Sequence, residues 1–274
     1  MKKRLLHATS IPALLLAVCV VALAAPNLPA QDWAKQKLDK SSRHQQWVSI
    51  KNGDRTVQAF IVYPEVSHKA PVIVLIHEIF GLSDWARSMA DDLAAQGYIV
   101  IAPDLLSGTG PNGGGSSSYP DQDARVKAVS MLSNDQVMAD LGAAADYGLK
   151  LPAANGKLAV IGFCWGGGKS FEFATQRHDL NAAYVFYGTP PKNLAAITAP
   201  VYGFYAGNDS RISSTVPQTR TDMKAAGKKY DAVIYPGAGH GFMRAGEDPG
   251  NTNAANTTAR NESMKRLEKL LKRL

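Results

Sequence analysis

The sequence predicts an α/β fold, in which a mostly parallel sheet carries helices on both faces. Short apolar runs rich in β-branched residues, such as 71–76 (PVIVLI) and 98–102 (YIVIA), are typical of buried parallel strands. Helical patterns alternate with these runs along most of the chain, as such a sheet requires. The length of 274 residues, with 45% hydrophobic and 19% charged residues, fits one large globular domain.

The expected elements follow in a regular order. Two extended segments, 46–51 and 56–63, flank Asn52-Gly53-Asp54, and Asn-Gly in this position predicts a hairpin at one edge of the sheet. Residues 107–119 (SGTGPNGGGSSSY) are mainly glycine and hydroxyl residues that can build no core, so we expect a mobile loop. Helices are expected at 84–96, 122–131, 134–149, 165–176 and 265–273 and between the last two strands, and further strands at 157–162, 182–187, 201–205 and 229–235.

The first 24 residues have the form of a secretory signal peptide. A basic start, Lys2-Lys3-Arg4, precedes an apolar run over 11–25, and Ala22-Leu23-Ala24 supplies the small residues that signal peptidase reads. The run is shorter than the about 20 residues that a membrane-spanning helix needs. We therefore expect a periplasmic or secreted protein.

The mature chain is expected to consist of an N-terminal arm or linker, residues 25–45, and a single domain, residues 46–274. Residues 1–24 carry three positive charges and no negative ones, so their removal lowers the formal net charge from +7 to +4. Much of this excess lies on the outer face of the amphipathic helix at 265–273, which we interpret as a solvated surface. We expect no nucleic-acid partner, no stable membrane insertion after cleavage, and a monomer.

Cysteine usage points to one thiol of interest. Cys19 leaves with the signal peptide, so Cys164 is the single thiol of the mature chain and can form no internal disulfide. It lies in Gly162-Phe163-Cys164-Trp165-Gly166, between an expected strand and an expected helix. This is the G-x-nucleophile-x-G elbow of α/β-hydrolases, with cysteine in the place of serine. A glycine-rich turn with an incidental, buried cysteine is the alternative.

The elbow predicts how Cys164 would act. The start of the following helix would lie under the sulfur, lower the thiol pKa and leave the group partly thiolate near neutral pH. The backbone N–H of Trp165 would point to the position where an oxyanion forms.

In α/β-hydrolases the catalytic acid and then the catalytic histidine follow the nucleophile along the chain. Asp209 follows the strand at 201–205, and His240 follows the strand that ends at 235. Both lie past strand carboxyl ends, where sites in open α/β sheets are found. Asp231 precedes its strand and Asp179 is too close to the elbow helix, so Asp209 is the expected acid.

The segment His77-Glu78-Ile79 follows the first long strand. We interpret His77 as structural and Glu78 as functional, and we assign the second oxyanion donor to the N–H of Ile79.

The motifs HEIFG, GFCWGG, AGNDSRI and GAGHGFMR together resemble the dienelactone hydrolase family, also called carboxymethylenebutenolidases, over most of residues 45–274. The resemblance implies an eight-stranded α/β-hydrolase domain without cofactor or metal, and a carboxylic ester hydrolase acting on small esters or lactones. It matches Cys164, Asp209 and His240 to a catalytic triad. It also matches Glu78 to a glutamate that contacts the resting thiol, and Arg244 to an arginine that binds the substrate carboxylate.

One position departs from the family pattern. Gly108 stands where family members often carry a second carboxylate-binding arginine, so we expect a weaker preference for carboxylated substrates and a more open pocket beside the loop 107–119.

Two other functions fit parts of the pattern. A non-catalytic binding protein on a hydrolase scaffold is one, because fold does not fix function. A thiol-redox protein is the other, although the chain has no CxxC and no resolving cysteine. The complete set of nucleophile, acid and histidine favours the hydrolase.

Overall fold

The computed structural model describes residues 32–274, so the expected signal peptide, residues 1–24, lies outside the described residues. The strands are β1 Gln45–Asn52, β2 Arg55–Val62, β3 Ala70–Ile76, β4 Ile99–Pro103, β5 Ala154–Phe163, β6 Ala182–Phe186, β7 Val201–Ala206 and β8 Tyr230–Tyr235. The helices are α1 Asp32–Asp39, α2 Asp84–Ala94, α3 Gln122–Met131, α4 Asn134–Leu149, α5 Trp165–Gln176, α6 Ser210–Ser213, α7 Val216–Ala225, α8 Phe242–Ala245 and α9 Ala254–Leu271. Short 3-10 turns are η1 Pro111–Gly113, η2 Ser116–Ser118 and η3 Leu194–Ala196.

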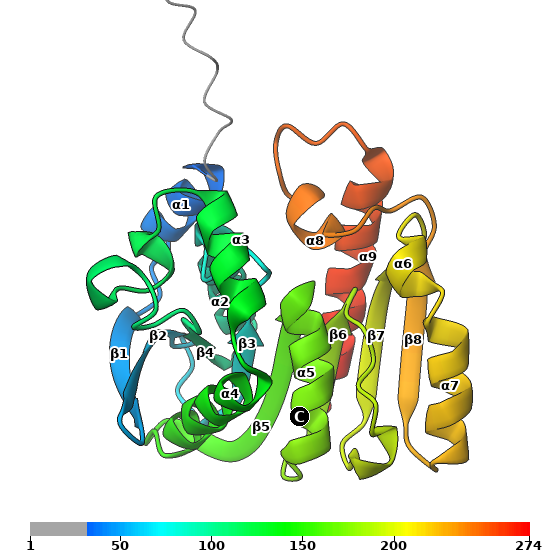
Figure 1. Ribbon diagram of the computed structural model, residues 1–274, viewed down its shortest axis with the longest axis horizontal. Helices are drawn as coiled ribbons and strands as arrows, with labels where there is room; N and C mark the ends of the chain where they lie inside the picture. The colour runs from blue at the N-terminus through cyan, green and yellow to red at the C-terminus, as the bar shows by residue number, and fades with distance from the viewer. Residues whose placement is uncertain (1–31) are drawn as a thin grey trace, which may run out of the picture. The chain divides into compact units, whose positions relative to one another are not determined.

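The strands form one eight-stranded sheet in the order β1-β2-β4-β3-β5-β6-β7-β8 (Figure 1). The hairpin β1–β2 and the pair β2–β4 are antiparallel, and the remaining neighbours are parallel. Gly53 makes the hairpin turn with a positive φ of 58°, a conformation that glycine adopts at no steric cost. The predicted fold class, a mostly parallel sheet with helices on both faces, is confirmed.

Two hydrophobic layers hold the helices on the sheet. One layer packs α1, α2, α8 and α9 against the sheet, and the other packs α4, α5 and α7 against the opposite face. β3 shows why its sequence is almost wholly apolar: Ile73 and Leu75 enter the first layer, whereas Val72, Val74 and Ile76 enter the second. Within residues 32–274, no helix combines the length and the apolar character that a membrane span requires.

The segment expected to be an arm or linker contains a helix. α1 buries Ala34 and Leu38 in the first hydrophobic layer, where they pack with residues of α2. Just after α1, Arg43 donates from Nε and Nη2 to the buried carboxylate of Asp91, at 2.9 and 2.5 Å. The sequence pattern did not predict this helix, because its apolar face consists of only a few residues. The described residues, 32–274, group into one compact unit that includes α1.

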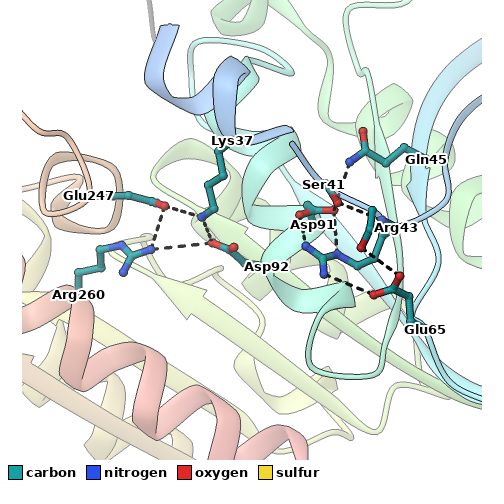
Figure 2. A network of polar contacts seen from close by, with 10 residues as sticks. Lys37, Ser41, Arg43, Gln45, Glu65, Asp91, Asp92, Glu247 and Arg260 are labelled. Carbon is teal, nitrogen blue, oxygen red and sulfur yellow. Dashed lines mark hydrogen bonds and ion pairs between the residues drawn. The ribbon is translucent and has the colours of Figure 1, made fainter. Parts of the chain in front are cut away.

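A cluster of four charged side chains links α1 to three later parts of the chain, which are α2, the segment after α8, and α9 (Figure 2). Lys37 Nζ lies 2.6 Å from Asp92 Oδ2 on α2 and 2.6 Å from Glu247 Oε1, just past α8. Arg260 on α9 completes the cluster, with Nη2 3.0 Å from the same oxygen of Glu247. Burial raises the pKa of Asp92, and the charge of Lys37 opposes that effect. Lys37 therefore offsets the cost of keeping two carboxylates side by side.

We expect Lys37→Met to lower the free energy of unfolding by about 1–2 kcal/mol in urea denaturation. Loss of one partner of a fully buried pair costs about 3–5 kcal/mol, but the Lys37 side chain is 34% exposed and solvent screens part of its interaction. Lys35→Met is the matched control, because Lys35 lies on the same helix in an exposed pair with Asp39. Equal effects of the two substitutions would contradict a specific role for the cluster.

Candidate active site

The predicted site residues meet at one edge of the sheet. β3, β5, β7 and β8 run in parallel, so their carboxyl ends lie at the same edge. Glu78, Cys164, Asp209 and His240 each follow one of these strands within a few residues. Positions this far apart in sequence converge because parallel topology brings the ends of their strands together.

The elbow holds Cys164 in an unusual backbone conformation. Its φ is 57° and its ψ is −118°, in the left-handed region that non-glycine residues rarely adopt. The two flanking glycines allow this turn: a Cβ on Gly162 would lie 1.9 Å from the carbonyl oxygen of Gly166. A Cβ on Gly166 would lie 2.3 Å from the carbonyl oxygen of His77. The sulfur is thereby presented at the start of α5, above the sheet edge.

A continuous set of hydrogen bonds links the thiol, the imidazole and the carboxylate. His240 Nε2 lies 3.0 Å from Cys164 Sγ, and His240 Nδ1 lies 2.5 Å from Asp209 Oδ2. When Nδ1–H donates to the carboxylate, Nε2 is the ring nitrogen that can accept a proton from the thiol.

The two competing acids lie elsewhere. Asp179 accepts two hydrogen bonds from Arg177, and Asp231 pairs with Arg266 at 3.3 Å. Each carboxylate is thus engaged by an arginine, and neither is hydrogen-bonded to His240.

The surroundings of Cys164 keep its thiol protonated at rest. Burial, followed by the negative charge of Glu78, raises the pKa of the thiol to about 11. Hydrogen bonds from the backbone N–H groups of Trp165 and Ile79 lower this pKa but do not outweigh the first two effects. The expectation of a partly ionised thiol near neutral pH was therefore wrong, because it considered the helix start and neglected burial and the nearby carboxylate. The two expected oxyanion donors do both reach the sulfur.

Glu78 and Arg244 form a buried ion pair beside the thiol. Arg244 Nε donates to Glu78 Oε2 at 2.8 Å, and the Glu78 side chain is only 3% exposed. Burial raises the pKa of Glu78, whereas the charge of Arg244 and its hydrogen bond oppose the increase. The resemblance implied that Glu78 contacts the resting thiol, but here its hydrogen bond goes to Arg244. Glu78 acts on Cys164 through its charge, without a hydrogen bond between them.

We expect Glu78→Gln to speed alkylation of Cys164 by iodoacetamide at neutral pH by about threefold. Removing the negative charge lowers the thiol pKa, and each unit by which this pKa falls gives about tenfold more thiolate at neutral pH. A less basic thiolate is also a weaker nucleophile, which leaves a gain of about threefold per unit. Glu65→Gln, a substitution of an exposed glutamate, is the control. An unchanged or slower alkylation rate would show that the Glu78 charge does not control the thiol.

An open pocket of about 370 Å³ lies over Cys164 and His240. Its other lining residues come mostly from α5, the segment after β6, and α6, and they include Trp165, Lys169 and Arg211. We call it the Cys164 pocket. Its volume lies in the range of small-molecule sites.

The glycine-rich loop differs from its expected role. Ser116 is buried and donates from N and Oγ to the two carboxylate oxygens of Asp104, at 2.7 and 2.6 Å, and its Oγ also accepts from the N–H of Leu82. The loop is therefore anchored, contrary to the expected mobile loop. Gly108 lines a separate hollow near Arg55 and not the Cys164 pocket, so the loop does not widen that pocket.

Sequence reasoning missed Tyr187, which lines the Cys164 pocket directly after β6. It is buried, has a positive φ of 39°, and its ring stands edge-on to His240 with centroids 5.1 Å apart. Its position at a strand carboxyl end was the available signal. His77 is fully buried, its ring stacks on Trp165, and burial lowers its pKa, an arrangement that fits the structural interpretation.

The amino-acid sequence is similar to those of proteins in one hydrolase family. A model of the dienelactone hydrolase family matches residues 57–274. A protein of Salmonella typhi, provisionally named a carboxymethylenebutenolidase, is 32% identical over 210 residues, which are 71% of this chain and 76% of that protein. Carboxymethylenebutenolidase 1 of Cupriavidus pinatubonensis is 28% identical over 207 residues, which are 73% of this chain and 87% of that protein.

Solved structures agree with the sequence relatives. The crystal structure of a provisionally named dienelactone hydrolase from Klebsiella pneumoniae has a TM-score of 0.70 and 26% identity, and the match covers 82% of this chain and 98% of that one. The fold and these relatives define an α/β-hydrolase, of the class that acts on ester or lactone bonds. The chain belongs to the dienelactone hydrolase family.

Proposed function

We propose that this protein is an exported hydrolase of small esters or lactones that uses Cys164 as nucleophile, His240 as general base and acid, and Asp209 as the group that orients the histidine. The hydrogen-bonded path from Cys164 Sγ through His240 to Asp209, at 3.0 and 2.5 Å, is the observation that carries the proposal. A nucleophile, its base and an orienting acid in hydrogen-bond reach are the parts that acyl transfer needs.

In the acylation step, His240 Nε2 takes the proton from Cys164 Sγ, and the sulfur attacks the carbonyl carbon. The C–S bond forms as the π electron pair of the carbonyl moves to its oxygen. The N–H groups of Trp165 and Ile79, which reach the sulfur in the resting enzyme, donate hydrogen bonds to this oxyanion. When the electron pair returns, the C–O bond to the alcohol breaks, and His240 gives its proton to the leaving oxygen.

In the deacylation step, water attacks the thioester and loses a proton to His240. The C–S bond then breaks, the proton returns to the sulfur, and the carboxylic acid leaves. A lactone follows the same course, except that the alcohol and the acid remain parts of one molecule. Asp209 keeps the imidazole in the required tautomer and stabilises its protonated form during both steps.

A protonated resting thiol would suit the proposed export of the protein. A thiolate is the form that reacts with oxidants, and a thiol with a pKa of about 11 is almost wholly protonated at neutral pH. A lone cysteine in an oxidising periplasmic or extracellular compartment would thus be protected from oxidation as long as its thiol stays protonated. The proposed cleavage after Ala24 would deliver the protein there.

Purified mature protein assayed with a panel of chromogenic esters and lactones tests the function. We expect turnover of small substrates and a transient acyl-enzyme on Cys164 visible by mass spectrometry. The intact mass of exported protein should correspond to a chain that begins at Ala25. No turnover of any ester or lactone would overturn the hydrolase, and a full-length chain retained in the membrane would overturn the export.

A further inference from the structure

The charges around the Cys164 pocket are unevenly neutralised. Lys169 and Glu172 both line it, and they neutralise one another with Nζ 3.5 Å from Oε2. Lys169 Nζ also donates to Asn134 Oδ1 at 2.6 Å, which holds the ammonium group toward α4. This pair leaves no net charge on its side of the pocket.

Arg211 also lines the Cys164 pocket, and its charge is not neutralised. Within residues 32–274, no ion pair or side-chain hydrogen bond engages its exposed guanidinium. Its backbone is nevertheless held firmly, because α6 buries Ile212 in the core and Ser213 Oγ donates to the carbonyl oxygen of Ala206 at 2.5 Å. An anchored backbone keeps this guanidinium at the pocket.

Arg211 lies close enough to the reacting atoms to influence them. It follows Asp209 by two residues, and its positive charge lowers the pKa of the Cys164 thiol, although burial and Glu78 act more strongly in the other direction. Arg244 is differently placed, since it is already bound to Glu78 and is not among the residues that line the pocket. The cation available to a ligand in the pocket is therefore Arg211.

We propose that Arg211 is a specificity-determining residue, which binds a carboxylate carried by the substrate at a distance from the ester carbonyl. The inference rests on the proposed esterase function and narrows its substrates to carboxylated esters or lactones. One unpaired guanidinium balances one carboxylate and can bind it through two parallel hydrogen bonds. A dianionic phosphate would leave excess negative charge beside Glu172, so a carboxylate fits better. Arg211, which follows Asp209 by two residues, would then take the role of the carboxylate-binding arginine that family members often carry at the position of Gly108.

The test compares two esters with the same leaving group, mono-4-nitrophenyl succinate and neutral 4-nitrophenyl butyrate. We expect wild type to prefer the succinate in kcat/KM, and Arg211→Gln to lose about tenfold of that preference, mainly through KM. A hydrogen-bonded ion pair sets this size, reduced by exposure of the guanidinium. Arg211→Lys should keep part of the preference. The control Arg125→Gln, which removes a cation outside the Cys164 pocket, should keep it in full.

A second readout does not depend on turnover. Succinate should slow alkylation of Cys164 by iodoacetamide in wild type and in Arg125→Gln, but not in Arg211→Gln. If wild type hydrolyses both esters and the ratio is unchanged in Arg211→Gln, the inference is overturned while the function stands. If wild type hydrolyses neither these two esters nor any other ester or lactone of the panel, the proposed function fails, and succinate protection alone decides whether Arg211 binds a carboxylate.

Discussion

Replacing Cys164 with alanine is expected to lower kcat for ester hydrolysis by on the order of 10³-fold or more, as loss of a nucleophile does in other catalytic triads. Alanine leaves the proposed oxyanion donors, the N–H groups of Trp165 and Ile79, in place but cannot form the acyl-enzyme. Steady-state kinetics and mass spectrometry of the trapped intermediate measure the two effects separately. Iodoacetamide should add one alkyl group to each mature wild-type chain and none to the variant.

The substitution Cys164→Ala should affect catalysis and leave the stability of the fold unchanged. Alanine keeps a Cβ at the strained position, so the melting temperature of Cys164→Ala should stay close to that of wild type. Cys164→Ser is the informative companion variant. It retains a nucleophilic atom, although the serine hydroxyl has a still higher pKa, so its kcat should lie between those of wild type and Cys164→Ala. Turnover by Cys164→Ala at the wild-type rate would end the assignment of the nucleophile.

Asp209→Asn is expected to lower kcat by on the order of 10²–10⁴-fold. The Asp209 side chain is 7% exposed, and its carboxylate accepts the hydrogen bond from His240 Nδ1, which leaves Nε2 free to act as base. An asparagine can present its amide N–H to Nδ1 instead, which favours the wrong tautomer and removes the charge that stabilises the imidazolium. The loss should appear in kcat for neutral and carboxylated esters alike, which separates it from the effect of Arg211.

Two matched substitutions accompany this prediction. Asp179→Asn and Asp231→Asn remove the acids that compete with Asp209 in the sequence, and both carboxylates are paired with arginines away from His240. We expect kcat to change less than about twofold for either, as for surface groups remote from the reaction. A loss of activity in one of them that matched the loss in Asp209→Asn would transfer the role of the acid.

Local patterns in the sequence were sufficient for much of the fold. The strands at 71–76, 98–102 and 201–205 were located to within a residue or two, because runs of buried apolar residues mark strands of parallel sheets strongly. The last helix begins at Ala254 instead of 265, since its first turns are polar and small and carry no readable periodicity. α6 and α8, each of four residues, were too short to leave a pattern.

Side-chain environments were harder to predict than positions. The start of a helix beneath Cys164 is visible in the sequence, but the degree of burial of the sulfur and the distance of Glu78 are not. Those two quantities reverse the expected direction of the thiol pKa. The loop 107–119 was misread for a similar reason: its serines looked free to move, whereas Ser116 binds the carboxylate of Asp104 twelve residues earlier.

The sequence by itself determined the alternation of the strands with the longer helices, the elbow around Cys164, and the succession of Cys164, Asp209 and His240. These features depend on residue type and local spacing, which are written along the chain. Only the tertiary structure decided which charges are paired and which remain free. It joins Glu78 to Arg244 across 166 residues and joins Lys37 to Glu247 across 210. Among the described residues, 32–274, it gives Arg211 no ion-pair partner at the pocket. Such pairings follow from the packing of distant segments, because electrostatic interactions depend on distance in space and on burial rather than on separation along the chain.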